Sequence, residues 1–119
     1  MTEQSAPEQN EKVDIDTFKR ADIRIGEIQS AEKVADADKL LKLIVWFGGE
    51  EKRQIVSGIA EYFPDPSALV GKRVAFAYNL QPRIIRGLES DGMILAAVDG
   101  DGAFSLLETH AVTPGARIR

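Results

Sequence analysis

Residues 22–47, DIRIGEIQSAEKVADADKLLKLIVWF, contain two runs in which apolar and other residues alternate, with a polar turn between them. Ile23 and Ile25 alternate in the first run, but Ile28 falls out of step. This break predicts a long strand bent by a bulge at Gly26, and long, bent first strands are typical of small barrels. The second run predicts a strand with one buried face, which holds Leu41, Leu43, Val45 and Phe47.

Three further segments have the short apolar alternation of strands: RQIVSGI at 53–59, RVAFAYNL at 73–80 and GMILAAV at 92–98. Between the first two, residues 66–70 begin with proline and predict one helical turn. Five short strands with a short helix between the third and the fourth predict an all-β protein with an OB-fold. This fold is a five-stranded Greek-key barrel whose exposed face binds oligonucleotides or sugars. A different small barrel or an α+β sandwich would show a similar pattern.

The ends of the chain add two features to this barrel. Residues 1–12 are polar and lack apolar periodicity, which predicts a disordered tail before a single domain at 13–119. Asp14 or Asp16 is placed to cap a short helical turn at the start of that domain. At the other end, an Asp-Gly hairpin, a strand around 104–107 and a last short strand predict a C-terminal β extension. Its apolar residues must pack against the barrel or against a second copy of the protein.

The charge is distributed unevenly along the sequence. The net charge of −4 argues against binding nucleic acid by bulk electrostatics, yet residues 52–90 hold six basic and three acidic side chains. A local basic patch or an ordinary solvated surface both fit these counts. The longest apolar run is too short to cross a membrane, the first residues do not form a secretory signal, and cysteine is absent. A cytoplasmic protein without a membrane span is the expectation.

Few residues have the chemistry of a catalytic or metal site. His110 is the single histidine and there is no cysteine, so zinc ligation by nitrogen and sulfur and cysteine nucleophiles are excluded. The segment DGDGAFSLLE begins like a calcium loop, but Ala103 stands at a ligand position, and we expect a hairpin turn there. Asp36 and Asp38 are expected in a solvated loop. The sequence therefore predicts a binding protein that is not an enzyme and needs no cofactor or metal.

Five blocks occur together in the order and spacing of a known family: DIRIGEI, ADADKLLKL, RQIVSGI, LVGKRV and NLQPRIIRGLESDGMILAA. Through them, residues 15–119 resemble the tRNA-binding domain of the methionyl-tRNA synthetase C-terminus and its stand-alone bacterial relatives. The resemblance implies an OB-fold, a homodimer built partly by the C-terminal extension, and recognition of tRNA by shape. It implies a non-catalytic role, alone or in trans with an aminoacyl-tRNA synthetase. A CsaA-like chaperone or protein-assembly module, which shares the fold, is the alternative.

The resemblance and the chemistry of the side chains suggest a set of RNA-binding residues. Guanidinium groups bind phosphate, amides and hydroxyls bind sugar or base, and a thioether can lie against a base. The family motif Ser-x-Gly-Met and its surroundings, with supporting positions on the barrel face, give this set: Lys39, Arg53, Ser57, Asn79, Arg83, Arg86, Ser90 and Met93.

Several of these residues also have a structural alternative. Met93 points to the same side of its predicted strand as core positions do, so it can belong to the core. Asn79 and Ser90 can close turns at strand ends. Lys39 and Arg53 can be ordinary surface charges. Two further side chains, Ile44 and Trp46, stand where polar residues would be typical. They fit either base stacking or packing, including a subunit contact.

Overall fold

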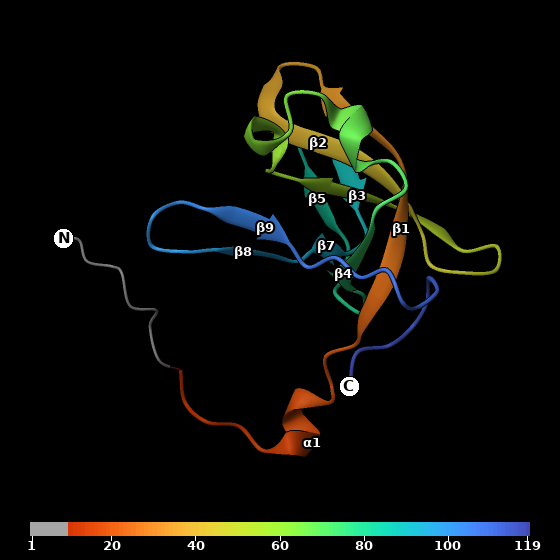
Figure 1. Cartoon of the computed structure of the whole chain (residues 1–119), viewed down its shortest axis with the longest axis vertical. Coiled ribbons are helices and arrows are strands. Elements are labelled where there is room, and N and C mark those ends of the chain that lie inside the picture. Colours follow the sequence, from red (N-terminus) through yellow and green to blue (C-terminus); the bar gives the residue numbers. More distant parts are fainter. Residues whose placement is uncertain (1–9) are drawn as a thin grey trace.

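Residues 10–119 are described by the computed structural model, and nearly all of their regular structure is β (Figure 1). The predicted tail at 1–12 lies outside the described residues except for 10–12, which are exposed and belong to no helix or strand. The all-β class predicted from the sequence is confirmed.

One antiparallel sheet of five strands, in the order β3-β2-β1-β4-β7, forms the body of the molecule. Its strands are β1 (Ile23–Val34), β2 (Ala37–Trp46), β3 (Lys52–Ser57), β4 (Arg73–Ala77) and β7 (Met93–Ile94). Two hairpins lie outside it, β5 (Arg83–Ile85) with β6 (Leu88–Ser90), and β8 (Ala96–Val98) with β9 (Phe104–Leu106). The helices are short: α1 (Ile15–Phe18), η1 (Ala60–Tyr62) and η2 (Pro66–Leu69).

Strand β2 buries the face that its alternation predicts. The side chains of this face are at most 5% exposed, whereas those between them are half-buried: the buried set is Leu41, Leu43, Val45 and Phe47. Burial of each such side chain contributes about 1.5–3 kcal/mol to folding. The strand begins earlier than expected, so Asp38 lies in β2 rather than in a loop, although its side chain is exposed.

The two edge strands of the sheet, β3 and β7, lie in contact with each other but do not pair. The end of β6 reaches β3, where the Asp91 N–H donates to Gln54 O at 2.9 Å. Helix η2 lies between β3 and β4 in the sequence, and its Leu69 is fully buried in the hydrophobic core. This helical position was predicted, and the strand order and the contact between the edge strands agree with the OB-fold.

Gly26 is not the site of a bulge, contrary to the sequence prediction. It pairs in regular register with Val74 of β4, and the register shifts of β1 fall between Ile28 and Ser30 and between Lys33 and Val34. The glycine is required by lack of space, since a Cβ at this position would lie 2.5 Å from Cγ1 of Val45. The first of these register shifts lies within the pairing of β1 with β2, which begins at Glu27.

The C-terminal extension differs from the expectation in two places. The predicted fifth strand divides at Leu95, because residues before it pair with β4 while those after it pair with β9. The predicted last strand is reduced to a single bridge between Arg24 and Arg117. Gly115, with φ of 94°, turns the chain just before this bridge, so only a brief stretch lies along β1.

The start of the domain follows the predicted capping pattern. Asp14 is the N-cap of α1, and its carboxylate accepts a hydrogen bond from the Thr17 N–H at 2.8 Å. The helix has no buried residue, and both Ile15 and Phe18 are at least 50% exposed. Packing among residues 10–119 therefore leaves these apolar side chains largely exposed.

Candidate nucleic-acid interface

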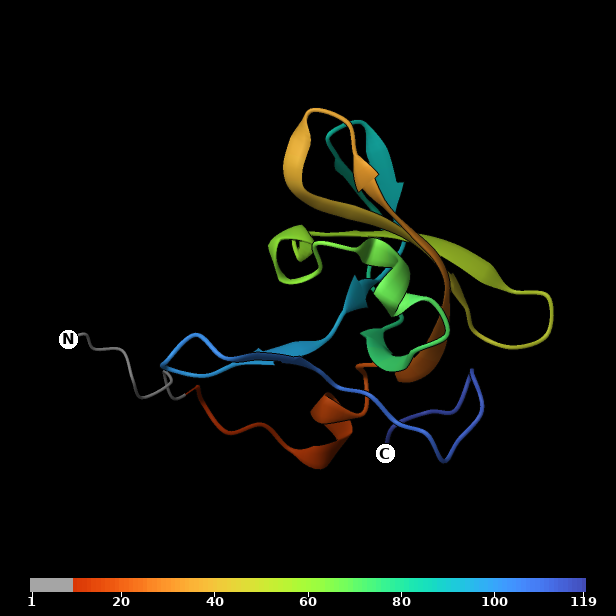
Figure 2. The same ribbon diagram turned by 45° about the horizontal axis from the view of Figure 1, so that its top comes forward.

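Residues 79–92 form a β-hairpin that projects from the barrel, and we call this segment the arm (Figure 2). Strands β5 and β6 are joined by the two residues Arg86 and Gly87, which have φ of 52° and 83°. Positive φ at both positions is what a type I′ hairpin turn requires. Arg83 and Arg86 are exposed, and Ile84 between them is 71% exposed. The arm thus presents two guanidinium groups and an apolar side chain to solvent.

The two roots of the arm are fixed by side chains that the sequence suggested as RNA contacts. Ser90 is 3% exposed, and its hydroxyl accepts from the Val56 N–H at 3.0 Å. The Asn79 amide accepts from the Asp22 N–H and donates to Arg20 O, each at 2.8 Å. These polar groups are engaged with protein backbone, which agrees with the alternative that they close strand ends.

Met93 lies at the base of the arm and is not part of the core. It is 45% exposed and pairs with Ala77 of β4. Gly92 before it has φ of 131°, and a Cβ there would lie 3.1 Å from both Ala77 O and Cδ1 of Ile55. The backbone thus packs closely at Gly92, and Met93, the next residue, is exposed beside the arm.

Arg53 is held inside a cluster around Tyr78. The guanidinium carbon of Arg53 lies 3.7 Å from the centre of the Tyr78 ring, and that of Arg24 lies 4.1 Å from it. The Tyr78 hydroxyl donates to Glu51, which also accepts from Nε of Arg53 at 2.9 Å. Asp22 accepts from Arg24 through both carboxylate oxygens, at 3.0 and 2.9 Å. We call these five residues the Tyr78 cluster.

The cluster changes the proton affinities of its members. The pKa of Glu51 is lowered chiefly because the Tyr78 hydroxyl donates to it, with a further lowering by Arg53. The pKa of Tyr78 is raised, first by burial and then by the carboxylate of Glu51. The hydrogen bond from Arg24 lowers the pKa of Asp22. At neutral pH the carboxylates are therefore ionised, and each offsets the charge of a neighbouring guanidinium group.

Lys39 and Ser57 lie at neighbouring ends of β2 and β3. Lys39 is exposed, and its carbonyl oxygen lies beside Gly58, the residue that follows half-buried Ser57. Figure 2 shows the turn between β1 and β2 at the same end of the barrel as the arm. In an OB-fold this end carries the two loops that flank the binding face. Lys39 therefore lies in the same region as the arm, whereas Arg53 belongs to the Tyr78 cluster.

Ile44 and Trp46 are half-buried on the outward face of β2. The indole N–H of Trp46 donates to Gly49 O at 2.8 Å, which fixes the ring against the turn between β2 and β3. This contact shows that the ring is at least partly used for packing within the chain. The indole N–H of Trp46 is therefore already used in a hydrogen bond within the chain.

Other kinds of site find little support in the described part of the chain. Within residues 10–119, no three histidine, aspartate or glutamate side chains gather as the ligands of a metal ion would. Over the same range, no helix has the length and apolar character needed to cross a membrane. His110 is exposed. The segment 99–102 forms the predicted hairpin turn, in which the Asp99 carboxylate accepts from the backbone N–H groups of Asp101 and Ala103.

Comparison with known proteins identifies the family. Residues 23–117 match the family described as "Putative tRNA binding domain". The chain belongs to this tRNA-binding domain family. The resemblance seen in the sequence is therefore confirmed.

Relatives of this tRNA-binding domain include both long and short proteins. A methionine–tRNA ligase from Deinococcus radiodurans is 46% identical over 119 residues, which cover 98% of this chain and 17% of the ligase. The crystal structure of a MetRS related protein from Pyrococcus horikoshii is 40% identical, with a TM-score of 0.84. The match covers 92% of this chain and all (100%) of that chain. The chain thus spans about a sixth of the ligase that it resembles.

A third relative has a different description. The crystal structure of a CsaA chaperone protein from Picrophilus torridus is 27% identical, with a TM-score of 0.81. The match covers 91% of this chain and 100% of the chaperone chain. The fold of the tRNA-binding domain is therefore shared with a protein described by a different activity.

Sequence reasoning missed the members of the Tyr78 cluster other than Arg53. Tyr78 follows Val74 and Phe76 at a spacing of two, and this alternation indicates no partner for its hydroxyl. Arg24 and Glu51 lie far from it in the chain, and no spacing rule connects them. This tRNA-binding domain offers one local signal for the cluster. Arg24 stands between Ile23 and Ile25 in β1, the strand that pairs with β4.

Proposed function

We propose that the protein is a non-catalytic tRNA-binding protein that uses the arm and the adjoining ends of β2 and β3. The observation that carries this proposal is the pair of exposed arginines on the arm, with Arg83 at the start of β5 and Arg86 in the turn. One of them, Arg86, has a left-handed backbone conformation that costs a residue with a side chain about 1 kcal/mol or more. The contacts that we assign to tRNA are Lys39, Ser57, Arg83, Arg86 and Met93.

The chemistry of these side chains suits a folded RNA. Guanidinium and ammonium groups bind backbone phosphates, which position a nucleic acid without reading its sequence. The Ser57 hydroxyl suits a ribose hydroxyl, and the Met93 thioether suits an exposed base. Because the net charge is −4, long-range attraction to RNA is weak and the local arrangement of cations matters more. Recognition by shape follows from contacts of this kind.

The proposal is tested by replacing both arginines of the arm with alanine and measuring tRNA binding by filter retention over a range of salt. Each lost phosphate contact lowers the salt slope by about 0.7–0.9, so the double variant should lose about 1.4–1.8. Lys12→Ala with Lys52→Ala is the matched control, since both lysines are exposed and lie outside residues 79–92. Equal weakening in the two double variants would reject the arm as the binding site.

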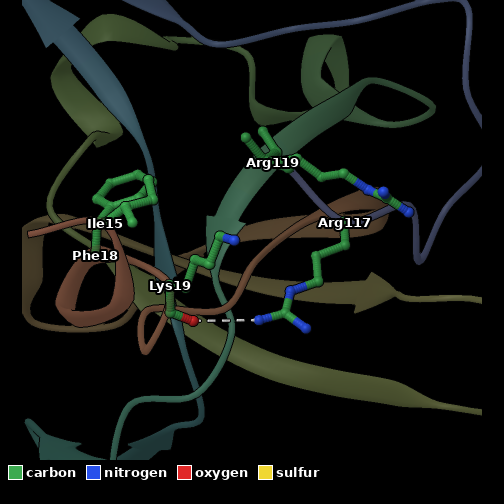
Figure 3. Close-up of a pocket in the computed structure, with 6 residues that line it drawn as sticks. Ile15, Phe18, Lys19, Arg117 and Arg119 are labelled. Carbon is green, nitrogen blue, oxygen red and sulfur yellow. Dashed lines mark hydrogen bonds between the residues drawn. The ribbon is translucent and has the colours of Figure 1, made fainter.

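We also propose that the protein forms a homodimer through α1 and the C-terminal segment. A cavity of about 370 Å³ lies between these parts, with an apolar wall formed by Ile15, Phe18 and Ile118 (Figure 3). Arg117 donates to Lys19 O at 3.3 Å across it. The three apolar side chains are 43–63% exposed in the single chain. Sedimentation equilibrium should show a dimer, and Phe18→Glu should shift it to a monomer without unfolding it.

The likeness to methionine–tRNA ligases supports a role beside a synthetase, and we propose that the protein acts alone or in trans with such an enzyme. This role would place it in the cytoplasm, where tRNA is aminoacylated. A comparison of folded tRNA with unstructured RNA of equal length provides the test. Shape recognition predicts clear preference for the folded tRNA, and equal affinity would contradict it.

Binding of unfolded polypeptide is a second candidate function. It is favoured by the CsaA chaperone structure and by the exposed apolar side chains on or beside the arm, Leu80, Ile84 and Met93. Competition between tRNA and a chemically unfolded protein for the wild-type surface distinguishes the two. Displacement of tRNA by the polypeptide would support this candidate, and independent binding would oppose a shared site.

A further inference from the structure

We infer that Arg53 positions the arm by clasping its two ends together, rather than by contacting RNA. Its Nη1 donates to Tyr78 O at 2.6 Å, at the residue before the arm begins. Its Nε lies 3.6 Å from Oδ2 of Asp91, next to the last residue of the arm. One side chain thus joins both roots of a segment of 14 residues (79–92). This inference rests on the proposed tRNA binding for its functional meaning.

The surroundings of Arg53 make it a poor ligand for phosphate. Its side chain is 17% exposed, and its guanidinium group packs against the Tyr78 ring. Glu51 accepts from it at 2.9 Å, and Asp91 adds a second carboxylate. Two carboxylates beside one guanidinium group offset its charge and repel an approaching phosphate. The site is built to hold Arg53 inward.

The remaining ties of the arm each reach one root. Asn79 bonds to the backbone before β1. Ser90 bonds to Val56, and the Gln54 amide donates to Glu89 O at 2.9 Å. Among the side-chain hydrogen bonds and ion pairs of residues 10–119, those of Arg53 are the ones that reach both sides. A clasp of this kind reduces the freedom that the arm would otherwise lose when it binds a ligand, and this preorganisation raises affinity.

Asp91 provides a test in which the two roles of Arg53 predict opposite signs. Asp91→Asn removes a negative charge from a surface that faces a polyanion. If Arg53 contacts RNA, this change releases it and strengthens tRNA binding. If Arg53 is a clasp, the change loosens the arm and weakens binding by about two- to fivefold, the range that a partly exposed ion pair supplies.

Glu89→Gln is the matched control on the same arm. Glu89 is exposed, and its carboxylate makes no hydrogen bond or ion pair with residues 10–119. The Glu89→Gln substitution removes one negative charge, as Asp91→Asn does, at a position two residues before Asp91. We expect this variant to bind tRNA at least as tightly as wild type, because only the electrostatic effect operates.

The experiment measures tRNA affinity together with backbone hydrogen exchange over 79–92 for wild type and both variants. We expect faster exchange and weaker binding for Asp91→Asn, and neither for Glu89→Gln. Equal affinities and equal exchange in the two variants would overturn the clasp. If wild type itself fails to bind tRNA, the proposed function fails, while the exchange rates without RNA still decide whether Arg53 and Asp91 hold the arm. Arg53→Lys, which keeps the charge but not the planar fork, should exchange as fast as Asp91→Asn.

Discussion

The Ser90 hydroxyl accepts a hydrogen bond from the Val56 N–H at 3.0 Å and joins the arm to β3 at a position that is 3% exposed. Ser90 belongs to the motif that suggested RNA contact, but its hydroxyl holds the arm to β3. Any effect of its replacement on tRNA binding acts through the placement of the arm and of Met93.

Replacement of Ser90 by alanine should lower the free energy of unfolding by about 1–3 kcal/mol. The change leaves the buried Val56 N–H without its acceptor, and an unsatisfied buried group carries a cost of that size. Denaturant unfolding provides the measurement. Ser105→Ala is the control, because Ser105 is exposed and its hydroxyl donates to the neighbouring Leu106 carbonyl, so a change within about 0.5 kcal/mol is expected there. A similar loss of unfolding free energy in both variants would argue against a special role for the hydrogen bond between Ser90 and Val56.

Arg86→Asn should stabilise the fold while weakening tRNA binding. Asparagine adopts the left-handed conformation found at Arg86, φ of 52°, more readily than arginine, so a gain of about 0.5–1 kcal/mol is expected. The lost cation removes a phosphate contact. Thermal unfolding and filter binding measure the two effects. Arg86→Lys keeps both the charge and the strained backbone, and it should match wild type in stability and retain most of the affinity.

Gly26→Ala should be destabilising by about 1–3 kcal/mol. The added methyl group would lie 2.5 Å from Cγ1 of Val45 and 2.8 Å from Cε1 of Phe47, which overpacks the core. Gly58→Ala provides the comparison, since its nearest neighbour, Lys39 O, lies 3.9 Å from the added atom. Chemical denaturation should separate the two alanine variants. Equal stabilities would show that the core beside Gly26 relaxes freely.

Stability should fall in acid, and Glu51 should contribute to the fall. The pKa of Glu51 is lowered in the folded state, first by the hydrogen bond from Tyr78. Its contribution is complete above the unfolded value of about 4.3 and disappears as the pH falls through the folded pKa. Glu51→Gln should therefore lower stability at pH 7 and show a shallower decline below pH 4.3. Glu89→Gln is the control in the same denaturant measurements and should match wild type in stability at pH 7, because the Glu89 carboxylate makes no hydrogen bond or ion pair with residues 10–119.

The sequence predicted those parts of the fold that depend on local pattern. Alternation placed the buried face of β2, and residue type gave Asp14 or Asp16 as the cap of α1, of which Asp14 is the one observed. Gly26 was misjudged because a glycine in a strand has two explanations, a bulge or a close neighbour, and the neighbour, Val45, lies on another strand. Pattern along one segment carries no information about such contacts.

The candidate site was predicted in composition but not in the roles of its members. Arg83 and Arg86 lie exposed on the arm, as their position in a turn suggested. Ser90, Asn79 and Arg53 carry the polar groups that RNA contact would need, but the structure uses those groups to hold backbone. Hydrogen-bonding capacity can be read from residue type. Its direction depends on partners as far away in the chain as Asp22 and Val56.

The side-chain hydrogen bonds and ion pairs that hold the arm within residues 10–119 lie at its roots. These interactions end at Glu89 on one side and at Asn79 on the other. We therefore expect that the hairpin between these two residues can be replaced while the interactions at the roots are kept. Adding residues in pairs on either side of Arg86 and Gly87 would preserve the alternation of the strands. New tips grafted in this way would give the same scaffold a different reach along its ligand.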